Sequence, residues 1–182
     1  MEMTKSMHEF ILHWGEMGGR WGVNRTVAQV HALLYLSLEP LTAEEIAETL
    51  SAARSNVSTS LRELQNWQLI TVQHQMGDRR DFFTTSTDVW ALFLTVVDQR
   101  IQREIVPTLA ALDRMAAEMR MEKSQQYEVS TRIQNLQTFL KDLHGWYLQV
   151  KTLPPSTLRS LIALGGGVAR WLPAGKKAKG GA

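Results

Sequence analysis

"ARSNVSTSLRELQNWQLITVQHQMGDRRDFF", residues 53–83, decides the fold. In its first half Val57, Leu61 and Leu64 recur at helical spacing, which predicts a helix with one buried face. In its second half "LITVQHQ" alternates apolar and polar residues as a half-buried strand does, "MGDRRD" is a turn, and the "FF" that follows opens a returning strand. We therefore expect a helix followed by a β-hairpin.

The preceding segment "LTAEEIAETL" supplies a second helix. Thr42 stands three residues before Glu45, the spacing of a capping box, in which the two side chains satisfy backbone donors at the helix start. A tight turn near residues 51–53 then joins two short helices into a helix-turn-helix. With the hairpin added, these parts predict a winged helix.

Amphipathic helices are expected on both sides of this unit. Before it, apolar residues at alternating spacings of four and three predict a helix that ends at Gly18-Gly19. These residues are Met3, Met7, Phe10, Trp14, Met17 and Trp21. A second helix should follow, with Asn24 or Thr26 as its N-cap.

After the wing, a helical stripe of Val89, Phe93 and later apolar residues begins near Thr87, and Pro107 should kink it because proline removes a backbone donor. A further helix has apolar residues in heptad order up to Pro154-Pro155. A last helix is expected over residues 156–172, weakened by a run of three glycines. A small winged helix cannot cover such one-sided helices, so we expect a second copy of the chain to do so.

The expected fold class is mainly α with a small β-hairpin wing and long dimerisation helices. We assign residues 1–23 to an N-terminal dimerisation helix, 24–86 to the DNA-binding winged helix, 87–153 to dimerisation helices, 154–173 to a C-terminal helical segment and 174–182 to a flexible basic tail.

Composition excludes several classes of protein. The chain has 182 residues, 44% of them hydrophobic, and no cysteine, so a disulfide framework or thiolate chemistry is ruled out. No signal peptide or membrane-spanning run is recognisable, and we expect a cytoplasmic protein. Six Lys and Arg residues and no acid follow Asp142; subtracting them from the net charge of +2 leaves −4 for residues 1–142. DNA contact must therefore come from a local basic patch.

Burying Val57, Leu61 and Leu64 turns a polar helix face outward. Small hydroxyls and amides on such a face let a helix enter the major groove and reach base edges, while arginines clamp phosphates. A helix face that is simply exposed to solvent is an equally common role for such residues. The arginine-bearing hairpin that follows favours the DNA-binding interpretation. The candidate contacts are Arg54, Ser55, Asn56, Ser58, Thr59 and Arg62 on the helix, with Arg79 and Arg80 in the wing.

The wing turn presents two arginines beside Gly77, where a wing meets the minor groove and arginine is favoured by the negative potential. Asp78 and Asp81 partly neutralise this turn. One arginine should therefore be held in an ion pair while the other points outward, and the sequence leaves open which is which.

"RSNVSTSLRELQNWQLI" followed by "GDRRDFF" resembles the winged helix of MarR-type transcriptional regulators, with Asp78-x-Arg80 matching that family's acid-x-arginine wing motif. "WG", "GRWG" and "ARSNVS", in this order, resemble the GbsR-like branch. The resemblance covers most of residues 8–93 and implies a homodimeric repressor or activator on a palindromic operator; the branch's namesake responds to choline. In one departure, Ala53 stands where many relatives have serine or threonine, so capping should fall to Ser51 and shift the helix start.

Six tryptophans suggest an effector site, because aromatic faces attract quaternary ammonium ions. Packing in a helix interface is the more frequent role for such residues, and both interpretations stay open. The candidate effector-binding residues are Trp14, Trp21, Trp90, Trp146 and Tyr147.

No enzyme is expected. The five histidines are scattered, and no serine lies in a recognisable arrangement with a histidine and an acid. We expect neither a metal nor a cofactor.

The sequence therefore predicts a sequence-specific DNA-binding transcriptional regulator, and we expect it to act as a repressor. It would act as a homodimer on a pseudo-palindromic operator in double-stranded DNA, under a small effector such as a quaternary amine. The alternative is a winged-helix protein-interaction module whose basic tail binds an acidic partner or a membrane surface.

Overall fold

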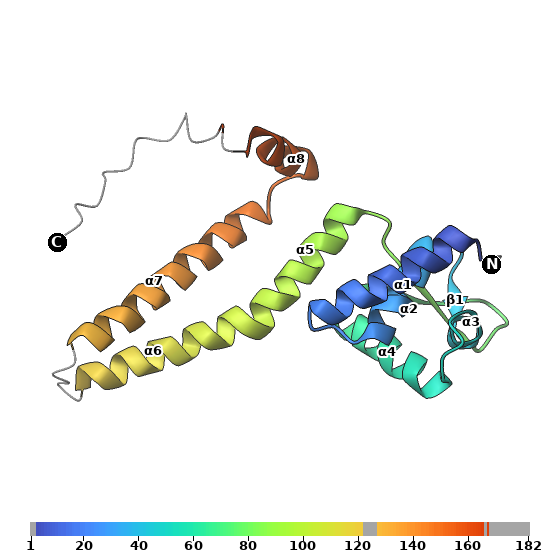
Figure 1. Ribbon diagram of the computed structural model, residues 1–182, viewed down its shortest axis with the longest axis horizontal. Coiled ribbons are helices and arrows are strands. Elements are labelled where there is room, and N and C mark those ends of the chain that lie inside the picture. Colours follow the sequence, from blue (N-terminus) through green and yellow to red (C-terminus); the bar gives the residue numbers. More distant parts are fainter. Residues whose placement is uncertain (1–2, 122–126, 166, 168–182) are drawn as a thin grey trace. The chain divides into compact units, whose positions relative to one another are not determined.

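The computed structural model describes residues 3–121, 127–165 and 167. The chain divides into two compact units, Met1–Arg103 and Glu104–Ala182, which are described separately. The first unit contains α1 (Lys5–Arg20), α2 (Arg25–Leu36), β1 (Leu41–Thr42), α3 (Ala43–Thr49), α4 (Arg54–Asn66), β2 (Ile70–His74), β3 (Asp81–Thr85) and α5 (Val89–Arg100) (Figure 1). The second contains α6 (Val106–Met121), α7 (Tyr127–Val150) and α8 (Pro155–Leu164).

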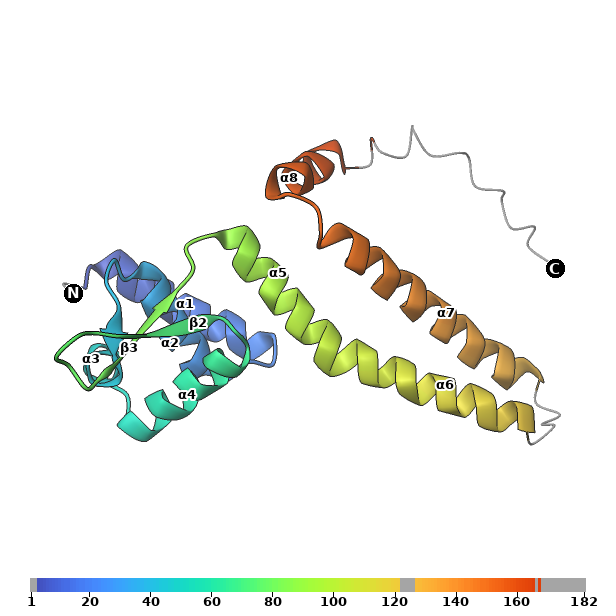
Figure 2. The same cartoon turned by 180° about the vertical axis from the view of Figure 1, so that it is seen from behind.

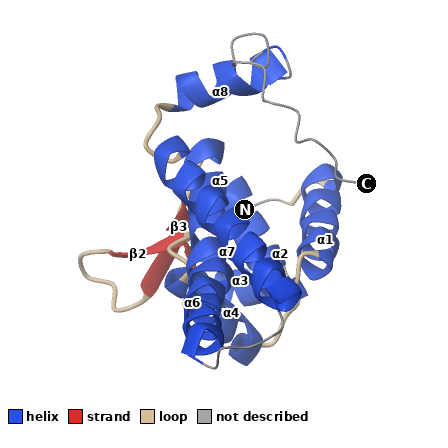
Figure 3. Cartoon of the chain, turned by 90° about the vertical axis from the view of Figure 1, so that its left-hand side faces the viewer, coloured by secondary structure: helices blue, strands red, loops and turns tan. Residues whose placement is uncertain are grey.

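The expected mainly α winged helix is confirmed (Figure 3). Its antiparallel sheet has the strand order β1-β3-β2, with Ile70 opposite Thr85 in the hairpin and Leu41 opposite Phe83 at the other edge. The hairpin lies where the alternating pattern predicted it. Strand β1 was not expected, because two residues are too few to show an alternation.

The core of the first unit forms around α2. Val30 and Leu33 of α2, Ile46 of α3, and Val57 and Leu64 of α4 have almost no exposed surface. Asn24 is the N-cap of α2, since its side-chain oxygen accepts a hydrogen bond from the Thr26 N–H at 2.8 Å. The open choice of cap is thereby resolved.

The expected end of the first helix at Gly18-Gly19 is wrong, because α1 continues to Arg20. Gly18 allows α1 to approach α2 closely: a Cβ atom there would lie 2.5 Å from the Cβ of Ala28. A Cβ at Gly19 would have no atom within 4 Å. Gly18 is thus a packing residue of the α1–α2 crossing and not a helix terminator.

Helix α5 begins at Val89, with Asp88 as its N-cap. Val89 and Phe93, the start of the expected stripe, are exposed, whereas Leu92 and Val96 pack against the core. A π-helical turn, η1 (Ile101–Ile105), follows directly and places the expected distortion just before Pro107. Proline has no backbone N–H to donate, and the wider hydrogen-bond spacing of a π turn accommodates this missing donor.

In the second unit, α6 and α7 lie side by side as a helical hairpin (Figure 2). The Lys141 ammonium lies 2.8 Å from the Asp113 carboxylate and joins the two helices. Helix α8 is shorter than the expected 156–172: it begins at Pro155 and ends at Leu164, and its C-cap Gly165 has a φ of +46°. The basic tail 174–182 and most of the segment beyond Gly165 lie outside the described residues.

We predict that Gly18→Ala destabilises the protein, because the added methyl group overlaps Ala28 of α2. Overpacking of this kind costs about 1–3 kcal/mol in the free energy of unfolding. Gly19→Ala is the matched control and should be neutral or stabilising by up to about 1 kcal/mol, because alanine favours the helix and the site is open. Urea unfolding of both variants measures this; equal stabilities would contradict the close crossing.

We also predict a pH-dependent stability from His31. Thr85 Oγ1 donates its proton to the Leu69 carbonyl at 2.7 Å, so His31 Nε2 must donate to Thr85 Oγ1 at 3.2 Å. Burial lowers the pKa of His31 to about 4 from 6.5. The unfolded chain therefore binds a proton first as the pH falls, and stability should decrease between pH 6.5 and about 4, by roughly 3 kcal/mol at most.

Urea unfolding across this pH range tests the effect, with His31→Gln expected to remove most of this decrease. An NMR titration that found an ordinary pKa for His31 in the folded protein would contradict it.

Candidate nucleic-acid interface

Helix α4 begins at Arg54, so the expectation that its start shifts and that Ser51 caps it is wrong. Ser51 has a φ of +50° and donates its backbone N–H to the Glu48 carbonyl, which makes it part of the end of α3. Ala53 occupies the N-cap position in extended conformation without a side-chain hydrogen bond. The first N–H groups of α4 are left without a side-chain cap.

One face of α4 is buried and the other is exposed, as predicted. Val57, Leu61 and Leu64 are buried in the core. The six candidate DNA contacts on α4 are all exposed: Arg54, Ser55, Asn56, Ser58, Thr59 and Arg62. The structure therefore gathers these side chains on one accessible surface.

An ion pair crosses the helix-turn-helix at the start of α4. The Arg54 guanidinium donates a hydrogen bond to the carboxylate of Glu44 in the first turn of α3. Both side chains are largely exposed, so the pair contributes little to stability. It holds the Arg54 guanidinium near the N-terminus of α4.

The wing resolves which arginine is paired. Arg80 Nη2 lies 2.6 Å from Asp78 Oδ2, Arg80 Nε lies 3.0 Å from the same oxygen, and the Arg80 backbone N–H donates to Asp78 Oδ1 at 2.9 Å. These bonds from Arg80 lower the pKa of Asp78 to about 2. Arg80 also lies over the ring of Phe82, with 5.4 Å between its guanidinium carbon and the ring centroid. Arg79 is exposed at the wing tip.

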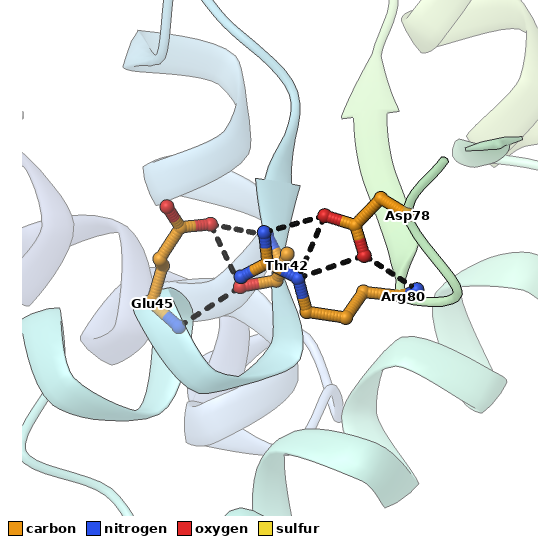
Figure 4. Close-up of polar contacts among 4 residues, drawn as sticks. All are labelled: Thr42, Glu45, Asp78 and Arg80. Carbon is orange, nitrogen blue, oxygen red and sulfur yellow. Dashed lines mark hydrogen bonds and ion pairs between the residues drawn. The ribbon is translucent and has the colours of Figure 1, made fainter. Parts of the chain in front are cut away.

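The predicted capping box is present and adjoins the wing. Glu45 Oε2 accepts hydrogen bonds from the Thr42 backbone N–H and hydroxyl, each at 2.7 Å, and the Glu45 N–H donates to Thr42 Oγ1 at 3.3 Å (Figure 4). These bonds lower the pKa of Glu45, and the charge of Arg80 makes a smaller contribution in the same direction. Thr42 pairs with Phe82 in the sheet, so one short segment connects the start of α3 to the base of the wing.

Two candidate effector residues of the first unit have other aromatic side chains as neighbours. Trp14 stacks on Phe10, with ring centroids 5.3 Å apart, and Trp90 meets Phe93 edge-on at 6.2 Å. Trp21 is 63% exposed.

The remaining two candidates belong to the second unit. Trp146 is exposed there, while Tyr147 is buried and lies under the ammonium of Lys151.

Sequence reasoning missed Trp67, the residue that follows α4. It adjoins a cavity of about 370 Å³ in the first unit. The walls include Thr59, Arg62, Asn66, Trp67, Gln99 and Arg103. The position of Trp67 directly after α4 was a usable signal, but only folding brings Gln99 and Arg103 beside it.

Two other kinds of site are missing from the part of the chain that the structure describes. Within the described ranges, no helix combines the length and the apolar character that crossing a bilayer requires. The same residues contain no group of three or more His, Asp or Glu side chains placed to hold a metal ion.

Residues 21–81 match the model of the MarR family. The HTH-type transcriptional repressor GbsR of Bacillus subtilis (strain 168) is 22% identical over 99 residues, which is 54% of either chain. The putative HTH-type transcriptional regulator YvaV of the same organism is 24% identical over 87 residues, covering 48% of this chain and 49% of that one. The chain thus matches about half the length of these curated relatives.

A crystal structure of a transcriptional regulator superposes with a TM-score of 0.64 at 20% identity, over 80% of this chain and 95% of the other. This similarity shows a shared fold. The resemblance to MarR-type winged helices is therefore confirmed over residues 21–81.

Proposed function

We propose that the chain is a MarR-type transcriptional regulator that binds double-stranded DNA through α4 and the wing. The observation that carries this proposal is the exposed face of α4, made of small hydroxyl and amide side chains with Arg62, on a helix whose other face is buried. The similarity to a GbsR repressor supports it. The function would place the protein in the cytoplasm.

In this proposal α4 enters the major groove. Ser55, Asn56, Ser58 and Thr59 are short enough to let the helix approach base edges closely, and each can donate and accept hydrogen bonds. Arg62 would bind a backbone phosphate and fix the position of the helix.

The two wing arginines have different roles in this proposal. Arg80 is held by Asp78 and shapes the wing, so Arg79 is the arginine that would reach the minor groove. Arg54 would exchange Glu44 for a phosphate when DNA binds.

We further propose a homodimer. Large apolar side chains are exposed on the second unit, and a stable monomer rarely exposes such a set. They include Met115, Leu136, Phe139, Leu143, Trp146 and Leu148. Two α4 helices related by a two-fold axis would read half-sites about one helical turn apart, roughly 10 base pairs, in a pseudo-palindromic operator.

The direction of regulation and the effector belong to the same proposal. Repression is the expected mode, and it is supported by one relative that is named a repressor. A quaternary amine bound by Trp14, Trp21, Trp90, Trp146 and Tyr147 stays a prediction.

We predict that Arg62→Ala combined with Arg79→Ala weakens binding to all DNA sequences, because both residues would contact the backbone or groove electrostatically. The slope of log affinity against log salt should flatten by about one unit for each DNA phosphate that is no longer neutralised. Fluorescence anisotropy with the chain's own upstream DNA and with random DNA, across a salt series, measures this.

Two variants sharpen this experiment. Arg114→Ala with Arg132→Ala removes the same charge from exposed positions of the second unit and should leave the slope unchanged. Arg80→Ala should loosen the wing but flatten the slope less than Arg79→Ala does, since Asp78 already neutralises Arg80. Unchanged DNA affinity in the Arg62/Arg79 variant would instead favour the protein-interaction module.

We predict that the chain sediments at twice its mass of 20.6 kDa and that Phe139→Glu shifts it toward the monomer. Phe139 is 61% exposed, so the substitution should not disturb the core of the unit. Leu38→Glu is the matched control, because Leu38 is 96% exposed in the first unit and should not affect dimerisation. A monomeric wild-type protein at micromolar concentration in analytical ultracentrifugation would contradict the proposal.

A further inference from the structure

The exposed polar face of α4 continues onto α5 and η1. Thr59, Arg62 and Asn66 of α4 line a cavity of about 370 Å³, and Gln99 of α5 and Arg103 of η1 line the same cavity. All of these residues except Gln99 are exposed. Thr59 and Arg62 are DNA contacts in the proposed function, so the cavity belongs to the surface that would face DNA.

Arg103 carries a charge that is available to a partner. Arg54 and Arg80 each form an ion pair. Within the described ranges, by contrast, neither Arg62 nor Arg103 lies within ion-pair distance of a carboxylate. Residues 1–142 have a net charge of −4, so unpaired arginines on one surface are the groups that can attract a polyanion locally.

Trp67 holds the Arg103 side chain in place. The guanidinium carbon of Arg103 lies 5.5 Å from the centroid of the Trp67 ring, within the range of a cation–π contact. Trp67 is the C-cap of α4, so the contact fixes Arg103 relative to that helix. A stacked guanidinium uses its face, and the N–H donors at its edge stay available for an oxyanion. Holding a long side chain in advance lowers the entropy cost of binding.

The backbone of DNA suits this set of donors. Arg62 binds a phosphate in the proposed function, and Arg103 lines the same cavity, so two long side chains can reach neighbouring phosphates of one strand. The amides of Asn66 and Gln99 can also donate hydrogen bonds to phosphate oxygens.

We propose that Arg103 is a further DNA-binding residue, which forms with Arg62 a two-arginine clamp on the phosphates of one strand, and that Trp67 is the residue that positions Arg103 for this contact. The inference rests on the proposed function and extends its contact surface from α4 and the wing to η1. A clamp on phosphates adds affinity without adding sequence preference.

Fluorescence anisotropy of the full chain, with its own upstream DNA and with random DNA across a salt series, tests the clamp. Arg103→Gln should weaken binding to both DNAs by a similar factor, roughly threefold to thirtyfold. The slope of log affinity against log salt should flatten by about one unit for each copy of Arg103 that contacts DNA. Arg103→Lys retains the charge and should retain most of this slope.

Arg114→Gln is the matched control, because it removes one exposed arginine from the second unit and should leave affinity and slope unchanged. Circular dichroism checks that the variants are folded.

A double-mutant cycle tests the positioning by Trp67. Trp67→Leu should weaken DNA binding in the wild-type background and have little further effect in the Arg103→Gln background, because the indole acts through Arg103. Trp67→Phe keeps an aromatic face under the guanidinium and should restore most of the affinity. Equal effects of Trp67→Leu in the two backgrounds would show a role in folding only and remove Trp67 from the proposal.

Phosphate ethylation interference on the upstream DNA locates the contact. We expect Arg103→Gln to lose sensitivity at one phosphate per half-site, next to the phosphate that Arg62→Gln loses. A changed preference between upstream and random DNA in Arg103→Gln would contradict a contact to phosphates alone.

The remaining outcomes separate this inference from the function on which it rests. If Arg62→Gln weakens DNA binding and flattens the slope while Arg103→Gln does neither, the clamp is wrong and the proposed function stands. If the wild type binds no DNA, the proposed function fails and the clamp fails with it.

Calorimetric titration with inorganic phosphate, at constant ionic strength, distinguishes the source of the phosphate group. Free phosphate should bind only weakly, because it lacks the neighbouring phosphates of a strand. Micromolar binding that Arg103→Gln abolishes, together with unchanged DNA affinity in that variant, would overturn the proposal.

Discussion

Burial of one face of α4 is the constraint on which the rest of the interface depends. Val57, Leu61 and Leu64 lie in the core with Val30 and Leu33 of α2, and removing one such side chain typically costs about 2–5 kcal/mol. A rotation of α4 about its axis would expose this face, so the helix has one favourable orientation. The outward position of its short polar side chains is thus a consequence of apolar packing on the opposite side.

The wing is held by the same segment that starts α3. Thr42 takes part in the capping box with Glu45 and also pairs with Phe82 in the sheet. The hydrogen bonds from Thr42 lower the pKa of Glu45, and the charge of Arg80, which is held by Asp78 and lies over Phe82, adds to this effect. Backbone pairing, a helix cap and an ion pair therefore meet where the wing joins the start of α3.

Arg62 belongs both to the exposed face of α4 and to the lining of the cavity. The buried face of α4 determines where Arg62 projects, and the contact of Arg103 with Trp67 places a second guanidinium in the same cavity. Arg103 belongs to η1, the π-helical turn that precedes Pro107, so the backbone distortion helps to define the position of this side chain.

The sequence by itself determined the elements whose signals are local: the helix with Val57, Leu61 and Leu64 on one face, the Thr42–Glu45 capping box, and the hairpin between residues 70 and 85. Periodicity and capping depend on residues a few positions apart, so they are visible in one chain. Tertiary structure alone decided that Arg80 is the paired arginine, that Gly18 serves the crossing with α2 and that β1 joins the sheet. It also brought Arg103 beside Trp67. The Gly18 crossing, the pairing of β1 and the Arg103–Trp67 contact depend on distances between residues apart in the chain, which packing sets and sequence spacing does not encode. The Asp78–Arg80 pair lies within the wing turn, and only the folded conformation of that turn shows which arginine the carboxylate holds.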